Sequence, residues 1–328
     1  MTEYQYYELV AVDRQLSKEE MGHLRGISSR AQISSTRFCN TYNYGDLKAD
    51  PRQLLSRFFD AYVYVSNFGY KVFAIKMPRN LIDESLLLRY LVNDTSSYTG
   101  VAGHWIIEFA YENEDGYDDD WDEGDGWMGS LLNIRNELMH GDYRSLYLSW
   151  LSQMDWLEPD SLSPAISPGI DDLSASQNAL CDFLKLDAQR VVASARVKPD
   201  YVSVQPEALV DRAQEVPSSS SVTVGQLLAS AEELRKKAHE KAMEQKLRQQ
   251  QEKAATVAAN EDACWRRVEE LFEKRRSSTV YSELSAELGD LQLMAKMLDR
   301  QTTYDRKLAE LKQRYAKKTS HWQGLRRR

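Results

Sequence analysis

The sequence predicts an α+β N-terminal domain, with a small sheet covered by helices, followed by an all-α C-terminal region that contains an antiparallel helical pair. Two observations lead to this prediction. Over the first 150 residues, segments rich in aromatic and β-branched residues alternate with segments whose apolar residues recur at helical spacing. From Val224 onward the chain is rich in Lys, Gln, Glu and Ala, and its apolar residues step by three and four.

The first elements are a strand, a helix and a second extended segment. The segment YQYYELVAVD (4–13) is typical of a strand in its aromatic and β-branched content. Ser17 and Glu20 form a capping-box pair, in which each side chain satisfies a free backbone N–H of the other, and they predict that a helix begins there. The residues 33–45 then read as extended.

The next helix is expected to begin at Asp50 and Pro51. Aspartate caps the free N–H groups of a helix start, and proline fits the first helical position because it has no N–H to satisfy. We expect this helix to cover 51–65. The elements predicted beyond it are a strand at 70–78, a helix at 82–92, a strand at 102–112, and two helices within 127–154 that are broken near Gly141.

Proline, glycine and serine mark the expected boundaries of the domains. Pro159, Pro164 and Pro168 lie close together, and a run of serines follows Pro217. The predicted organisation is an acidic α+β domain at 1–154, a linker at 155–170, a small helical segment at 171–198, a linker at 199–222, and a basic helical or coiled-coil domain at 223–328.

The C-terminal region shows apolar seams interrupted by a polar stretch. The residues 241–258 are polar enough to predict a solvated single helix. A short QTT connection between two later seams predicts an antiparallel pair. The seam positions are Trp265, Val268 and Phe272 in one helix, Leu284, Leu288, Leu291, Ala295 and Leu298 in the next, and Tyr304, Leu308, Leu311 and Tyr315 in the last.

Charge is distributed unevenly along the chain. The residues 221–328 contain 23 Lys and Arg against 16 Asp and Glu, whereas residues 1–220 contain 19 against 34. The formal net charge of −8 therefore combines an acidic body with a basic helical tail. This asymmetry either governs the choice of partners or only keeps the two parts from associating non-specifically.

Composition excludes several classes of protein. No run of about 18 apolar residues occurs, so we expect neither a membrane span nor a membrane partner. The start MTEYQYYELV lacks the pattern of a secretory signal. Cys39, Cys181 and Cys264 are far apart and odd in number, unlike a disulfide framework or a cysteine-based zinc site. The expected compartment is a bacterial cytoplasm.

The stretch ENEDGYDDDWDEGDGW (112–127) carries nine carboxylates in sixteen residues. A calcium loop of the EF-hand type must end in Glu, but the register from Asp118 ends on Gly129 and that from Asp120 on Leu131. We predict a solvent-exposed acidic insertion. The more specific alternative is a docking site for a basic protein partner. Weak binding of divalent metal ions and mimicry of a nucleic acid are two further alternatives. The residues assigned to partner binding are Asp118, Asp119, Asp120, Trp121, Asp122, Asp125 and Trp127.

Signatures of common catalytic sites are absent from the sequence. No histidine pair has the spacing of a zinc protease, and no GxSxG, GxxxxGKS or GxGxxG motif occurs, so we expect no metal and no cofactor. His140 lies at an expected helix end, where a cation favours the dipole. Asp13 and Arg14, with Arg25 and Arg30, read as an anion site or as surface ion pairs. An enzyme would require Asp13, Arg14, Arg30 and His140 to converge.

The basic tail has two interpretations. Acidic residues interleave with the basic ones and few aromatic residues are suited to base stacking, which favours a helical protein–protein module. The alternative is a nucleic-acid-binding surface that neutralises phosphates. The residues that would carry it are Lys236, Lys237, Arg275, Arg276, Lys317 and Lys318.

Five segments carry a resemblance to known proteins. They are YYELVAVDR, LRGISSRAQI, YGDLKADP, CWRRVEELFEKRRSSTVY and RKLAELKQRYAKKTSHWQGL. Nearly the whole chain resembles an uncharacterised family of bacterial proteins, and its last hundred residues resemble the tail of some bacterial SWIM-type zinc-finger proteins. The finger itself, CxC followed by CxH, is absent, so the resemblance does not imply zinc binding. It implies a bacterial cytoplasmic protein that works alongside other proteins, and it carries over no catalytic residue.

These observations predict a non-catalytic interaction or scaffold subunit of a bacterial multi-protein system, with one or more protein partners. The alternative is a nucleic-acid-binding protein that acts through its basic helices. The helical region also offers a route to homo-oligomerisation.

Overall fold

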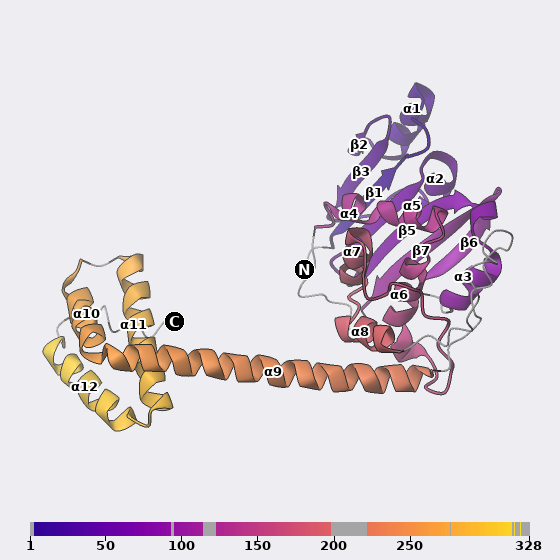
Figure 1. Cartoon of the computed structure of the whole chain (residues 1–328). Helices are drawn as coiled ribbons and strands as arrows, with labels where there is room; N and C mark the ends of the chain where they lie inside the picture. Colours follow the sequence, from indigo (N-terminus) through magenta and orange to yellow (C-terminus); the bar gives the residue numbers. More distant parts are fainter. Residues whose placement is uncertain are drawn as a thin grey trace. The chain divides into compact units, whose positions relative to one another are not determined.

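The structure of the chain, a computed structural model, describes residues 3–92, 95–113, 123–197, 222–275, 277–316, 318 and 322. It divides into two compact units, residues 1–235 and 236–328. The first contains an antiparallel sheet with helices, and the second is helical (Figure 1). The fold class predicted from the sequence is therefore confirmed, although the sheet is larger than expected.

The sheet has seven strands, and every pairing between neighbours is antiparallel. Its order is β2-β3-β1-β4-β5-β7-β6, so that β4 lies at the centre. The strands are β1 (Gln5–Val10), β2 (Gln32–Ile33), β3 (Arg37–Tyr42), β4 (Ala61–Ser66), β5 (Tyr70–Pro78), β6 (Ser97–Val101) and β7 (His104–Glu112).

Both faces of the sheet are buried. Successive side chains of a strand point to opposite faces, so Val63 belongs to one core and Tyr62 and Tyr64 to the other. The Tyr62 face packs against α1 (Lys18–Ile27) and α2 (Pro51–Phe58). The Val63 face packs against η1 (Arg79–Leu81), α3 (Glu84–Tyr90), α4 (Trp127–Leu131), α5 (Asn133–Met139), α6 (Arg144–Ser152), η2 (Met154–Trp156), α7 (Ala175–Phe183) and α8 (Ala188–Arg196).

The predicted helix starts are confirmed, but one predicted helix is too long. The capping box of Ser17 and Glu20 is present, and Asp50 accepts a hydrogen bond from the backbone of Arg52. The expectation of a helix over 51–65 is wrong beyond Phe58, because the residues 61–66 form β4. That strand is buried on both faces, so it lacks the polar alternation that reveals a strand with one wet face.

The residues between the sheet domain and the long helix belong to the same compact unit. Ala165 and Ile170, in the segment expected as a linker, are buried, and α7 and α8 pack into the core of the sheet. A bridge joins Leu162 to Thr223, and Val224 and Leu227 of the next helix reach that core. The residues 198–221, which include most of the second expected linker, lie outside the described residues.

The second unit is built from the later part of α9 (Val224–Ala259) and from α10 (Glu261–Glu273), α11 (Ser278–Met297) and α12 (Gln301–Arg314). Most predicted seam residues meet in its core, but Leu298 follows the end of α11 and is largely exposed. The turn between α11 and α12 is Leu298–Arg300, and not the expected QTT. Asp299 adopts a left-handed conformation there (φ +52°), and Arg300 donates its N–H to the carbonyl of Ala295, which ends the helix.

A buried ion pair fixes the start of β4. Burial favours the neutral form of Asp60, but the backbone N–H groups of Asp13 and Val12, at 3.0 and 2.7 Å, and the Lys76 ammonium, at 3.1 Å, outweigh it. Together they hold the pKa of Asp60 below its ordinary value. Asp60 lies between the end of α2 and the start of β4. Its contacts with Val12, Asp13 and Lys76 hold the neighbouring ends of β1, β4 and β5 together.

The substitution Asp60→Asn should lower the free energy of unfolding at pH 7 by about 1–3 kcal/mol, because it leaves Lys76 buried without its counter-ion. A depressed pKa contributes stability that is present above the unfolded-state value and is lost as pH falls through the folded value. The difference between the wild type and Asp60→Asn should therefore shrink as pH falls below about 4. Urea unfolding between pH 7 and pH 3 measures this, with Asp160→Asn at an exposed site as the control. A difference that does not change with pH would contradict it.

Candidate functional site

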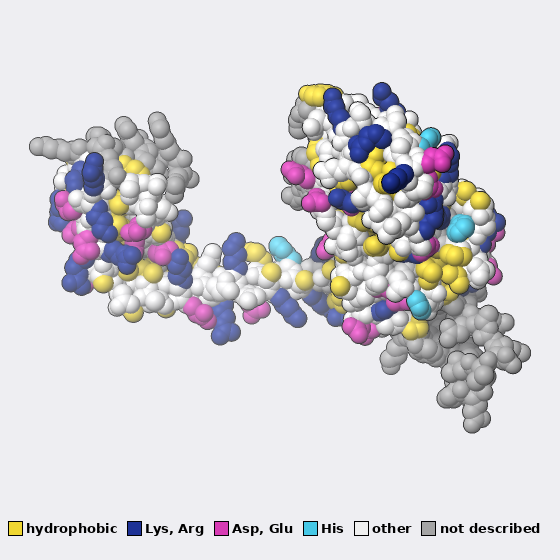
Figure 2. Space-filling model, turned by 90° about the horizontal axis from the view of Figure 1, so that it is seen from above, with side chains coloured by type: hydrophobic (Ala, Val, Ile, Leu, Met, Phe, Trp, Pro, Cys, Tyr) yellow, Lys and Arg dark blue, Asp and Glu magenta, His cyan; other side chains and the backbone are white. Residues whose placement is uncertain are grey.

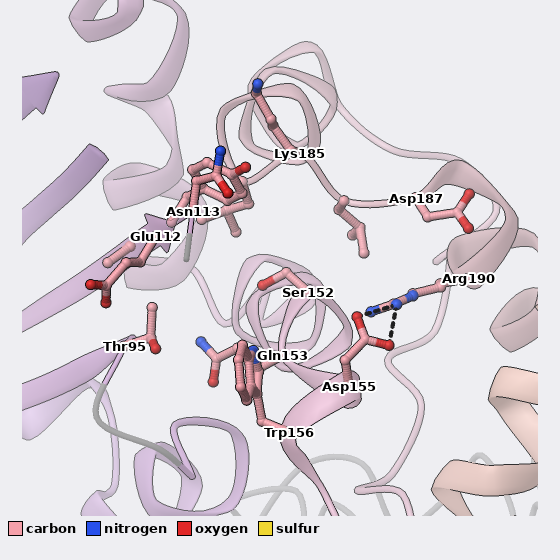
Figure 3. Close-up of a pocket in the computed structure, with 14 residues that line it drawn as sticks. Thr95, Glu112, Asn113, Ser152, Gln153, Asp155, Trp156, Lys185, Asp187 and Arg190 are labelled. Carbon is pink, nitrogen blue, oxygen red and sulfur yellow. Dashed lines mark hydrogen bonds and ion pairs between the residues drawn. The ribbon is translucent and has the colours of Figure 1, made fainter. Parts of the chain in front are cut away.

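A pocket of about 550 Å³ opens in the first unit beside the end of β7. Three further segments complete its wall: the end of α6 with η2, the connection between α7 and α8, and Thr95 (Figure 3). Its volume lies within the usual range of ligand-binding pockets. The residues that line it are Thr95, Ala110, Tyr111, Glu112, Asn113, Ser152, Gln153, Asp155, Trp156, Leu184, Lys185, Leu186, Asp187 and Arg190.

Gln153 is the unusual residue of this pocket. Its side chain is 3 % exposed, yet within the described residues neither its amide nitrogen nor its amide oxygen has a hydrogen-bond partner. The residue caps the C-terminus of α6, and Figure 3 shows its amide on the side of Thr95. A buried polar group left unpaired costs about 1–3 kcal/mol. A ligand that pairs with the amide would offset this cost.

Unpaired buried polar atoms concentrate around the same helix. Of the seven such side-chain atoms in the described part of the chain, five belong to Ser145, Ser149, Gln153 and Arg190. The two serines and Gln153 are spaced four residues apart, so they share one face along α6. Native interiors pair nearly all of their polar atoms, so these atoms are unusual, and among their residues Gln153 and Arg190 line the pocket, whereas Ser145 and Ser149 do not.

Trp156 lies beside Gln153 at the pocket. It is 62 % exposed, although indole rings in folded proteins are usually well buried. The two residues belong to one 3₁₀ turn, in which the N–H of Trp156 donates to the carbonyl of Gln153 at 3.1 Å. The turn keeps the two residues next to each other at the pocket, with the amide buried and the ring largely exposed.

The charged residues of the pocket are mostly engaged with one another. Arg190 donates to both oxygens of Asp155 at 2.7 and 2.5 Å and to the carbonyl of Leu151, whereas its Nε has no partner among the described residues. Burial favours the neutral form of Asp187, but Arg235 and the backbone of Gln189 keep its pKa below the ordinary value. These pairs give the pocket fixed walls.

Lys185 lines the pocket from a strained backbone position. It has a φ of +50°, in the left-handed region that costs a residue with a Cβ about 1 kcal/mol or more. The turn ends α7 through a hydrogen bond from the N–H of Leu186 to the carbonyl of Cys181. The ammonium group lies 5.6 Å from the centre of the Tyr111 ring. A left-handed residue just after a helix is a common way to end it, and Asp299 does the same after α11.

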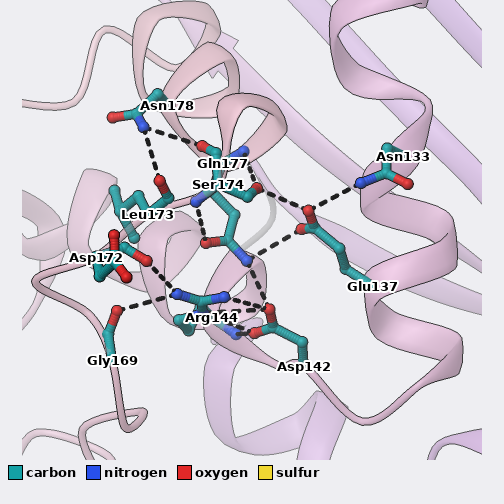
Figure 4. A network of polar contacts seen from close by, with 10 residues as sticks. All are labelled: Asn133, Glu137, Asp142, Arg144, Gly169, Asp172, Leu173, Ser174, Gln177 and Asn178. Atoms are coloured by element: carbon teal, nitrogen blue, oxygen red, sulfur yellow. Dashed lines mark hydrogen bonds and ion pairs between the residues drawn. The ribbon is translucent and has the colours of Figure 1, made fainter.

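A second polar cluster, near the other end of α6, is fully paired and serves the fold. The amide of Gln177, 0 % exposed, donates to Glu137 and Asp142 and accepts from the backbone of Ser174 (Figure 4). Arg144 joins Asp142 to the carbonyls of the loop before α7. Gln177 therefore shows how this fold satisfies a buried glutamine when no ligand is involved, in contrast to Gln153.

The sequence did not single out the pocket residues. Gln153 and Trp156 fall in SWLSQMDW, which reads as the end of an amphipathic helix. The only signal in the sequence is the spacing of Ser145, Ser149 and Gln153, which places polar residues on a single face of an otherwise apolar segment. That face could not be recognised as buried until the tertiary packing was known.

The acidic stretch is described only in part. Asp118, Asp119, Asp120, Trp121 and Asp122 lie outside the described residues, and Asp125 is exposed. Trp127 begins α4 and packs against Phe183, with their ring centres 5.1 Å apart. The side chain of Trp127 is therefore occupied by core packing.

The end of the acidic stretch is attached to β1. The hydroxyl of Tyr4 donates to the carbonyl of Glu123 at 2.8 Å, and Gly124 lies directly on the ring of Tyr6. A Cβ at Gly124 would lie 2.6 Å from that ring, so only glycine allows so close an approach.

The residues considered for an enzyme do not converge. Asp13 binds Arg135 through two hydrogen bonds, at 3.0 and 2.6 Å, and Arg14 binds Glu20. His140 caps α5, and its ring nitrogen lies 2.7 Å from the carbonyl of Asn136. Arg25 donates to the backbone of Ala31, and Arg30 is exposed. Each described contact of these side chains is one that supports the fold.

The cations of the helical tail are interleaved with carboxylates. Lys and Arg side chains alternate with Asp and Glu side chains over these helices (Figure 2). Lys318 binds Glu273 at 3.2 Å, Lys236 and Lys237 also have partners, Arg275 is exposed, and Arg276 and Lys317 lie outside the described residues. Further ion pairs are Arg248–Glu252, Lys253–Asp290, Arg267–Glu287, Lys307–Glu261 and Arg314–Glu269.

Comparison with known proteins adds no further information. No protein-family model matches the chain, and no curated protein or solved structure matches it. The predicted family resemblance therefore stays a prediction. Within the described ranges, no three His, Cys, Asp or Glu side chains gather as a metal site would require, and no described helix has both the length and the apolar character to cross a membrane.

The two buried glutamines provide a matched test of the pocket. Gln153→Met removes an unpaired amide and should raise the free energy of unfolding by about 1 kcal/mol. Gln177→Met breaks a fully paired network and should lower it by about 1–3 kcal/mol or more. Urea unfolding of both variants measures the difference. A loss of stability in Gln153→Met as large as that in Gln177→Met would show that the Gln153 amide is a structural group.

Two glycines test the attachment of the acidic stretch to β1. Gly124→Ala and Gly126→Ala share the cost of a positive φ, +82° and +93°, but only Gly124→Ala places a methyl group against Tyr6. We expect Gly124→Ala to lower the midpoint of thermal unfolding more, by a difference equivalent to about 1–3 kcal/mol. Equal midpoints would show that the Tyr6 ring moves away from the added methyl group without a loss of stability.

Proposed function

We propose that this protein is a non-catalytic interaction subunit of a bacterial multi-protein system, whose first unit binds a ligand in the Gln153 pocket. The observation that carries the proposal is the unpaired, buried amide of Gln153. A carboxamide donates and accepts hydrogen bonds, but it does not act as an acid, a base or a nucleophile at ordinary pH. Its presence in the lining of the pocket supports recognition of a ligand.

The ion pairs in the walls of the pocket also support ligand binding. Asp155 is held by Arg190 in a two-point contact, and Asp187 by Arg235, so that these carboxylates keep fixed positions. Walls that are already ordered before a ligand arrives reduce the entropy lost on binding. The stability lost by leaving the Gln153 amide unpaired is the kind of cost that folded proteins carry at functional sites.

The helical unit supports a protein partner over nucleic acid. A phosphate-binding surface needs cations that are available to replace counter-ions. In this unit Lys253, Lys307, Arg314 and Lys318 already bind carboxylates. Interleaved charges of both signs are instead typical of helices that choose a partner by charge pattern.

The acidic stretch is the proposed contact for a basic partner. Its carboxylates, and not Trp127, carry this part of the proposal, because the indole is packed against Phe183. Since Gly124 and Tyr4 fix the end of the stretch, its charges are presented from a defined point of the first unit. The proposal places the protein in the bacterial cytoplasm, consistent with its three free cysteines.

Neutralising the acidic stretch tests the partner contact. In the variant Asp118→Asn, Asp119→Asn, Asp120→Asn, Asp122→Asn, a partner captured by the full-length protein should be lost or weakened at least tenfold. Wild-type capture should also weaken as salt is raised, because exposed charges are screened. Quantitative capture from bacterial cells at low and high salt measures both effects.

A matched variant controls for net charge. Glu158→Gln, Asp160→Asn, Asp171→Asn and Asp172→Asn remove as many charges from exposed positions elsewhere in the first unit. This variant should keep the partner. If both variants lose it equally, net charge and not the acidic stretch determines binding. If neither loses it, the acidic stretch is not the contact.

A further inference from the structure

The amide of Gln153 offers one donor and one acceptor side by side on a rigid plane. The complementary ligand must therefore present an adjacent acceptor and donor on one planar edge. Nucleobases do so: adenine, for example, presents a ring nitrogen acceptor beside its amino group, and glutamine pairs with that edge through two hydrogen bonds. Because both amide atoms are unpaired, the site is suited to a two-point contact.

The indole of Trp156 supplies the second requirement, a flat surface beside the edge. Proteins that bind bases in single strands or in pockets stack them on aromatic rings, and each stack contributes about 1–3 kcal/mol. Trp156 is largely exposed, so its face is accessible, and the shared 3₁₀ turn fixes the ring relative to Gln153. An extended peptide would satisfy the amide but would have less use for the ring.

The charges of the pocket do not select a phosphate. Arg190 is committed to Asp155, and Lys185 lies over the ring of Tyr111. Glu112 and Asp187 also line the pocket, and Asp187 is paired with Arg235. The base itself, rather than an attached phosphate, must then provide most of the affinity.

From this juxtaposition we propose that the Gln153 pocket binds a nucleobase, stacked on Trp156 and paired along one edge with the amide of Gln153. The inference deepens the proposed ligand-binding function and rests on it. The base can come from a free nucleoside or nucleotide, or from single-stranded nucleic acid, since both present the same edge and ring.

Calorimetric titration of the full-length protein tests the proposal with three sets of probes. These are the four nucleosides, their 5′-monophosphates, and short single-stranded RNA oligonucleotides. A nucleoside should bind, and its monophosphate should bind within about threefold of it, because the two cations that line the pocket, Lys185 and Arg190, are engaged with Tyr111 and Asp155. Oligonucleotide binding at least tenfold tighter would identify a single strand as the source of the base, and equal affinity would identify the free nucleoside. Absence of binding by every probe at millimolar concentration would overturn the proposal.

Variants locate the binding at the pocket. Trp156→Ala should weaken binding about 5- to 150-fold, and Trp156→Phe should retain most of it because a ring remains. Gln153→Met should weaken it by a similar factor. Tyr44→Ala removes an aromatic ring that is also largely exposed, 77 % against 62 % for Trp156, and that does not line the pocket, so it should change nothing. Binding that survives both pocket variants would place the base elsewhere and overturn the proposal.

A modified ligand separates edge pairing from stacking. Purine riboside has the ring of adenosine without the amino donor, so it should bind the wild type less tightly than adenosine but bind Gln153→Met equally well. A constant preference for adenosine in both proteins would overturn the pairing. Dipeptide amides form a further arm: if they bind through Gln153 and nucleosides do not, the pocket remains a ligand site and the nucleobase proposal fails.

Discussion

Burial of the sheet on both faces is the constraint on which the rest of the first unit depends. A sheet with two covered faces requires a layer of helices on each, and α6 lies within the thicker layer. Its residues from Ser145 to Leu151 are all buried. A helix surrounded in this way has no wet side on which to place polar residues. The burial of Ser145, Ser149 and Gln153 therefore results from the packing of the layers around α6, and not from the residues' own preference.

At the end of α6, the same burial places a polar side chain, that of Gln153, in the lining of the pocket. Gln153 is still inside the unit, but η2 turns the chain outward within three residues and exposes Trp156. The pocket forms where the buried helix meets the end of β7 and the turn after α7. A polar amide in such a place lowers the stability of the free protein and raises its capacity to recognise a ligand. The paired Gln177, carried by the neighbouring α7, shows that the same fold readily satisfies a buried amide.

Ion pairs have different roles in the two units. In the first unit, the buried pair of Asp60 with Lys76 and the pair of buried Arg135 with the more exposed Asp13 hold elements in register. In the helical unit, exposed pairs cover the helices with both signs of charge, and each contributes little to stability. Under the proposed function, their role is the pattern of charge that they offer to a protein partner. The acidic stretch adds a block of one sign, whose end is attached to β1 by Tyr4 and Tyr6.

The sequence by itself determined the features that depend on neighbours along the chain. Capping at Ser17 and Asp50, the strand at 70–78 and the apolar seams of the last helices follow from local hydrogen bonding and periodicity, and the structure confirms them. Only the tertiary structure decided that 61–66 is a strand, because a segment buried on both sides has no polar period to read. It also decided the site. Whether Gln153 is paired depends on residues from β7, α7 and α8 that are distant in sequence, and a single sequence contains no signal of such distances.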